Sequence, residues 1–190
     1  MSKSANQLKR RLEEARHIDD TLERRLWIVG VITQATADLG VRPVLVGGAA
    51  VEFYTLGGYA TQDVDIVMPS SPQIDDAMSG LGFEKSGRYW VRADLDVMLE
   101  APPPPLAGDP DRVVEIQVES WKVYVIGIED LVIDRLNAQV HWQSDEDRRW
   151  AERLVAGAPD TIDWPYLERR ARDEGVEEPL AELRSRVVGE

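Results

Sequence analysis

The chain has 190 residues, and its 35 acidic and 22 basic residues give a formal net charge of −13 at pH 7. Its hydrophobic share of 43% is ordinary for a globular protein, but no basic run supplies the positive face of a general nucleic-acid binder. Without cysteine it has neither disulfides nor thiolate metal sites, and without a long apolar run or an apolar leader we expect a cytoplasmic protein with no membrane partner.

The first forty residues predict helices that pack on a core. Residues 4–17 are charged and favour a helix, and Asp19, Asp20 and Thr21 then offer an N-cap. Apolar residues recur at steps of three and four from Leu22 to Leu39, and Gly40 follows. This spacing is typical of a helix that buries one face.

The next stretch predicts a strand, a turn, a short helix and a second strand. Residues 44–46 are a short β-branched run typical of a buried strand, and it ends at Gly47-Gly48, where the backbone can turn sharply. Residues 49–56 predict a short helix closed by Gly57-Gly58. Residues 63–68 predict the second strand.

Two aspartates share one face of that second strand. Side chains alternate along a strand, so Asp63 and Asp65 point the same way while Val64 and Ile66 point the other. Two neighbouring carboxylates repel each other and resist desolvation, and a Mg²⁺ ion bound between them would relieve both costs. The alternative is a strand with one solvated face.

The Gly47-Gly48 turn followed by Asp63-Val64-Asp65 resembles the signature of the nucleotidyltransferase fold superfamily. The run from Gly57 to Asp65 is similar to the bacterial branch that contains AbiEii-type toxins and related antitoxins. That branch often has a basic residue just before Thr61, where this chain has Tyr59-Ala60. The resemblance implies an α/β (α+β) fold, with a mixed sheet flanked by helices and a C-terminal helical cover.

The middle of the chain predicts further strands and the third carboxylate that the resemblance implies. After a short helix over residues 74–81, residues 87–92 and 94–99 predict one bent strand or two. By the resemblance, Asp96 is the third ligand and Asp94 the second choice; the alternative is an exposed edge face. The proline-rich residues 101–110 predict a stiff surface loop, and residues 113–118 and 121–126 predict two more strands.

The C-terminal third predicts helices. A helix from Ile128 opens with Glu129-Asp130-Leu131 and carries Arg135, which is similar to a motif of the AbiEii-type branch. By this resemblance Arg135 would bind phosphate; a solvated helix residue is the alternative. Asp147 could likewise take part in catalysis, but Ser144 and Asp147 also form a capping box, which we favour. Asp163 is expected to cap a further helix.

These elements predict three parts of one compact unit. They are N-terminal helices over residues 1–40, a nucleotidyltransferase-like core over 41–126 and a helical region over 127–190. The resemblance implies a two-metal Mg²⁺ site whose catalytic ligands are Asp63, Asp65 and Asp96. It also implies a nucleoside triphosphate co-substrate, such as ATP, bound with the help of a second set of residues. That set is Gly47, Gly48, Thr61 and Arg135.

Two functions follow from the resemblance. In the first, the protein is a transferase that moves a nucleoside monophosphate to a hydroxyl of a protein, an RNA or a small molecule, within a toxin–antitoxin or defence system. RNA stays among the acceptors because a metal can bridge phosphates, although no basic patch would capture it. In the second, a non-catalytic, antitoxin-like acidic protein uses the same fold to bind a protein partner.

Overall fold

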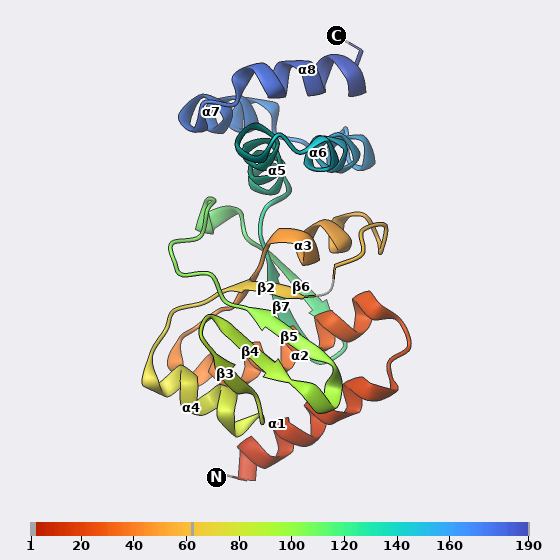
Figure 1. Ribbon diagram of the computed structural model, residues 1–190. Helices are drawn as coiled ribbons and strands as arrows, with labels where there is room; N and C mark the ends of the chain where they lie inside the picture. The colour runs from red at the N-terminus through yellow and green to blue at the C-terminus, as the bar shows by residue number, and fades with distance from the viewer. Residues whose placement is uncertain (1–2, 62, 190) are drawn as a thin grey trace.

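The computed structural model describes residues 3–61 and 63–189 and has a mixed α/β architecture around one sheet (Figure 1). The sheet has seven strands in the order β3-β4-β5-β2-β1-β7-β6. Its strands are β1 Val44–Leu45, β2 Val64–Val67, β3 Glu84–Ser86, β4 Tyr89–Arg92, β5 Val97–Glu100, β6 Val114–Val118 and β7 Trp121–Val125. The β1–β7 and β2–β5 pairs are parallel, and the other pairs are antiparallel.

Helices lie on both sides of this sheet and at one end of the molecule. The α-helices are α1 Lys3–Glu13, α2 Thr21–Thr36, α3 Gly47–Tyr54, α4 Pro72–Gly80, α5 Ile128–Trp142, α6 Asp145–Gly157, α7 Trp164–Glu174 and α8 Glu177–Val187. Helix α2 packs on β6 and β7 and against α1 and α4, whereas α3 packs on β2 and against α5 and α6. Helices α5 to α8 lie together beyond α3 (Figure 1). None of the helices in the described ranges is long and apolar enough to cross a membrane.

Helix α2 is the central helix of the core. Its N-cap is Asp20, whose side chain accepts a hydrogen bond of 2.8 Å from the Glu23 N–H, as the sequence predicts. All residues from Leu26 to Thr33 are buried, because the helix is covered on every side. Gly30 allows helix α2 to lie close to β7, since a Cβ there would be 2.4 Å from the Cβ of Trp121.

Two local predictions differ from the structure. Helix α3 begins at Gly47 itself, so the Gly-Gly pair forms its first turn instead of a turn before it. The strand predicted over residues 94–99 begins only at Val97, because Ala93–Leu95 form a 3₁₀ turn and Asp96 has a φ of 51°. Helical and left-handed conformations break the alternation that a strand requires.

Candidate active site

Three carboxylates meet where β2 and β5 lie side by side. These strands are parallel, and their register places Asp65 opposite Glu100. Asp63 precedes β2 on the same side, and within the described residues the three side chains each offer an oxygen within 4.8 Å of the others. The structure therefore brings the predicted pair Asp63 and Asp65 together and adds Glu100.

The charges of this group are only partly compensated. Burial raises the pKa of Asp65 to about 6, and the negative charges of Asp63 and Glu100 add to that rise. The Gly48 N–H and the Arg135 guanidinium oppose it without cancelling it. Such an arrangement stores electrostatic repulsion that a bound cation would relieve.

The start of α3 is built around Asp65. The Gly48 N–H donates to the Asp65 carboxylate at 3.3 Å, at the end of the helix where the macrodipole favours negative charge. Gly47 has a φ of 55°, and a Cβ there would lie 2.4 Å from Asp65 Oδ2. Only glycine meets both conditions at position 47, and a Cβ on Gly48 would lie 2.9 Å from the Tyr59 ring.

Thr61 and Arg25 hold the segment that leads into β2. The Thr61 hydroxyl donates to the Asp63 carboxylate at 3.0 Å. Arg25, from α2, donates to the backbone carbonyl of Thr61 and forms an ion pair with the buried Glu52 of α3. Thr61, predicted to bind the co-substrate, thus lies beside the carboxylate group and orients one of its members.

Arg135 reaches the site from α5. Its guanidinium donates to the carboxylate of Asp147 at 2.8 Å and also pairs with Asp134. It is close enough to Asp65 to oppose the rise in that residue's pKa. Ser144 accepts a hydrogen bond from the Asp147 N–H at 3.1 Å, which confirms the predicted cap at Ser144, whereas the Asp147 carboxylate pairs with Arg135 and does not complete a capping box.

Asp96 does not join the carboxylate group. It precedes the first residue of β5, and among the described residues only Asp63, Asp65 and Glu100 offer oxygens within 4.8 Å of one another. Glu100 takes the place expected for Asp96, because the parallel register sets Glu100 beside Asp65. The second choice, Asp94, is exposed and pairs with Arg92 at 2.7 Å.

Glu100 and Arg88 are the two site residues that the sequence did not single out. Arg88 lies at the turn between β3 and β4, and its Nε is 3.0 Å from Glu100 Oε1. Its side chain is 61% exposed, so the guanidinium borders the site from the solvent side. A signal for Glu100 existed in the alternation of Asp96, Met98 and Glu100, but alternation alone does not say which residue lies beside Asp65.

A family model covers most of the chain, and a solved structure has a similar fold. A family model described as "Nucleotidyltransferase of unknown function (DUF6036)" matches residues 26–186. An antigenic nucleotidyltransferase-like protein from Paracoccidioides brasiliensis is similar in structure, with a TM-score of 0.57, 16% identity and coverage of 90% of this chain and 98% of that one. The antibiotic-resistance factor ANT(2'')-Ia reaches a TM-score of 0.49 at 15% identity, over 83% of this chain and 90% of its own. No curated protein sequence matches the chain.

Proposed function

The chain belongs to this family of nucleotidyltransferases, and from that membership we propose a Mg²⁺-dependent enzyme that moves a nucleoside monophosphate from a nucleoside triphosphate to a hydroxyl group. The observation that carries the proposal is the group formed by Asp63, Asp65 and Glu100. Three carboxylates whose negative charges Arg88 and Arg135 compensate only in part destabilise the fold and favour the binding of a cation.

The residues present fit a magnesium site. Mg²⁺ prefers oxygen ligands, and the group offers three carboxylates within 4.8 Å of one another. Burial first, and then the negative charges of Asp63 and Glu100, raise the pKa of Asp65, and a bound cation would offset both effects. Asp63, Asp65 and Glu100 would hold the ion, which when bound supplies positive charge that stabilises phosphoryl transfer.

The chain's own residues would bind and orient the nucleotide. The first turn of α3, which begins at Gly47, directs backbone N–H groups toward the site and favours anions such as phosphate. Arg88 and Arg135 would each offer a guanidinium to the triphosphate, since Arg binds phosphate oxygens in a bidentate manner. Thr61 would keep Asp63 in its orientation.

The reaction itself is a displacement at phosphorus. The acceptor oxygen forms a bond to the α-phosphorus, the bond between that phosphorus and the bridging oxygen breaks, pyrophosphate leaves and the hydroxyl proton passes to solvent. A role in a toxin–antitoxin or defence system, with a protein partner, is part of the proposal only through the resemblance of residues 57–65 and 128–136 to the AbiEii-type branch.

The test is calorimetric titration of Mg–ATP and Mg–CTP into the wild type, Asp65→Asn and Asp76→Asn. Asp76 is an exposed aspartate on α4 and serves as the matched control. We expect binding to the wild type and the control, and at least about a hundredfold weaker binding to Asp65→Asn, because even outer-shell partners of a metal contribute 10- to 100-fold. A folded wild type that binds no triphosphate would contradict the proposal and favour the non-catalytic, antitoxin-like alternative.

A further inference from the structure

The edge strand β6 has one side without a neighbouring strand. The sheet ends at β6, and within residues 3–61 and 63–189 this strand pairs only with β7. It is five residues long, whereas β3 at the opposite edge has three. Proteins usually keep edge strands short or strongly charged, because a long edge offers its backbone groups to another chain. The β6 edge is therefore where a further strand could be added.

The hydrogen bonds of β7 show which backbone groups of β6 point outward. The Ile126 N–H donates to the Leu45 carbonyl of β1 at 3.0 Å, and alternate residues of a strand direct their backbone groups to opposite neighbours. Every second residue of β7 from Val125 backward therefore bonds to β6. Their partners on β6 are Val114, Ile116 and Val118. The N–H and C=O groups of Glu115 and Gln117 point away from β7, and no backbone hydrogen bond among the described residues uses them.

The side chains of β6 divide into an apolar row and a polar row. Val114, Ile116 and Val118 lie on the face toward α2, since the β7 residues opposite them are buried. Val114 is 40% exposed, so the apolar row is only partly covered. Glu115 lies on the other face, where the Lys122 ammonium compensates its charge at 2.7 Å. The edge thus carries little net charge of its own, although the whole chain carries −13.

One antiparallel register fits a second copy of the same strand. Centring the pair on Ile116 brings the two Ile116 side chains together and sets Val114 opposite Val118 of the second copy. Glu115 then lies opposite Gln117 of the second copy, and the outward backbone groups of these residues form two hydrogen-bonded pairs. Moving the centre to residue 115 or 117 would set Glu115 opposite another glutamate, and like charges in that position destabilise a pair.

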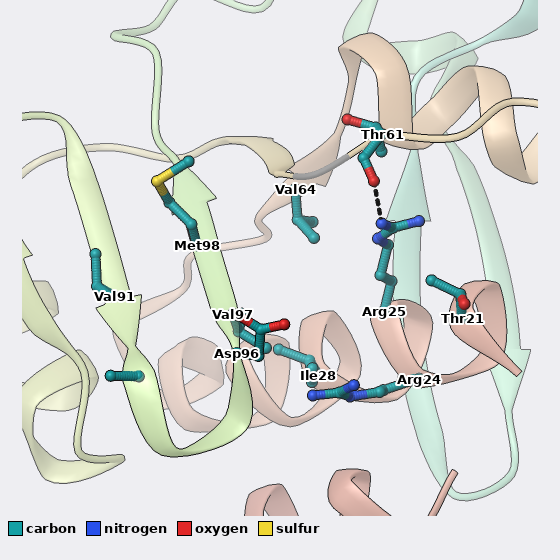
Figure 2. Close-up of a pocket in the computed structure, with 11 residues that line it drawn as sticks. Thr21, Arg24, Arg25, Ile28, Thr61, Val64, Val91, Asp96, Val97 and Met98 are labelled. Carbon is teal, nitrogen blue, oxygen red and sulfur yellow. Dashed lines mark hydrogen bonds between the residues drawn. The ribbon is translucent and has the colours of Figure 1, made fainter. Parts of the chain in front are cut away.

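We propose that β6 is the interface of a homodimer, in which the β6 strands of two copies pair antiparallel about Ile116 and join the two sheets across a two-fold axis. The paired area is small, so the dimer is weak and reversible. Strands β1 and β7 separate β6 from β2 and its carboxylates by about 14 Å across the sheet. The cavity of about 730 Å³ that Figure 2 shows lies farther away, beside β5. Both lie outside the paired strands.

The register is tested by changing the residue that faces Glu115 of the second copy. Gln117→Glu would create like-charge pairs on both sides of the axis, whereas in its own chain it would face Lys122 and keep the monomer folded. We expect the association constant, measured by sedimentation velocity over a range of protein concentrations, to fall about tenfold. Gln117→Lys should raise it by a similar factor, because lysine then faces Glu115. Gln73→Glu adds the same charge on the exposed side of α4 and should leave it unchanged.

Two further measurements separate this dimer from other kinds of association. In hydrogen exchange followed by NMR, the amides of Glu115 and Gln117 should be unprotected in dilute protein and become protected as the concentration rises. Those of Val114, Ile116 and Val118 should be protected throughout, because they bond to β7. Raising sodium chloride from about 0.01 M to about 1 M should strengthen association, since it screens the repulsion between two chains of charge −13.

A chain that stays monomeric at every concentration and salt would overturn the proposal. A dimer that Gln117→Glu does not weaken, or in which the amides of Glu115 and Gln117 stay unprotected, would overturn it as well. The dimer needs neither nucleotide nor metal, so a wild type that binds no Mg–ATP would contradict the transferase function and leave the outcome of these measurements unaffected.

Discussion

Two groups of carboxylates in this protein have opposite surroundings. At the start of α5, the side chain of Asp130 is fully buried and accepts hydrogen bonds from the Tyr166 hydroxyl at 2.8 Å, the Arg170 Nε at 3.2 Å and the Asp109 N–H at 2.9 Å. At the edge between β2 and β5, Asp65 accepts one hydrogen bond from the Gly48 N–H and faces two other carboxylates.

The difference separates carboxylates that hold the fold from carboxylates that we propose to bind a cation. Asp130 joins the proline-rich loop to α7, and Gly108 lies so close that a Cβ there would be 2.8 Å from its carboxylate. Glu129, also buried, accepts from the Asp163 N–H at 2.9 Å and pairs with Arg112. The partners of Glu129 and Asp130 thus explain the Glu129-Asp130 motif by its structural role, whereas within the described residues Asp63 and Asp65 each accept one hydrogen bond, from Thr61 and Gly48.

The largest effect on stability should follow from removing the carboxylate of Asp130, which accepts three hydrogen bonds. Asp130→Ala would leave Tyr166 and Arg170 without their shared partner, and we expect unfolding free energy to fall by about 3–5 kcal/mol, as for other broken buried pairs. Urea denaturation measures the change. The exposed Asp160→Ala, in the same part of the chain, should stay near the wild type, and equal stability of the two variants would contradict the bracing role.

Replacing Asp65, in the partly compensated group, should raise the free energy of unfolding instead of lowering it. In the folded protein the pKa of Asp65 is raised to about 6 from its ordinary 3.8, so between these values the folded state binds more protons than the unfolded state. The stability of the metal-free wild type should therefore fall as the pH rises from about 4 to about 6. At pH 7 Asp65→Asn should be more stable by about 1–2 kcal/mol, after allowance for solvent screening.

Denaturation at several pH values checks this prediction, with Asp76→Asn as the control. Saturating Mg²⁺ should then stabilise the wild type at pH 7 and leave Asp65→Asn unchanged, because only a folded state that binds the ion gains from it. A wild type whose stability is the same at pH 4 and pH 7, with and without Mg²⁺, would contradict the view that the Asp65 group destabilises the metal-free fold.

The smallest effect should be the change in Mg–ATP affinity caused by replacing Arg88, which borders the carboxylate group from the solvent side. Arg88→Ala should weaken Mg–ATP binding about three- to tenfold, because an exposed guanidinium contributes roughly 1 kcal/mol to an anion's binding, and Arg88→Lys should recover part of it. Calorimetric titration measures both, with the exposed Arg172→Ala on α7 as the control. Unchanged affinity in Arg88→Ala would remove Arg88 from the nucleotide site.

The sequence by itself determined the features that depend on neighbouring residues. The spacing of Asp63 and Asp65 placed them on one side, and the caps at Asp20, Ser144 and Asp163 are present as predicted. The apolar periodicity predicted helix α2, although it indicated one buried face and the structure buries Leu26 to Thr33 on every side. Each of these depends on backbone geometry over a few residues, which repeats in the same way in every protein.

Only the tertiary structure decided which distant residues meet. Glu100, and not Asp96, lies beside Asp65 because β2 and β5 are parallel neighbours in a fixed register, and their other faces, with Val64 and Leu99, are buried in the core. A slip of one residue would move every side chain of a strand to the opposite face, so core packing fixes the register. Alternation is a local property of the chain, whereas register is set by non-local packing. The identity of the third carboxylate depends on the register, and the sequence alone could not decide it.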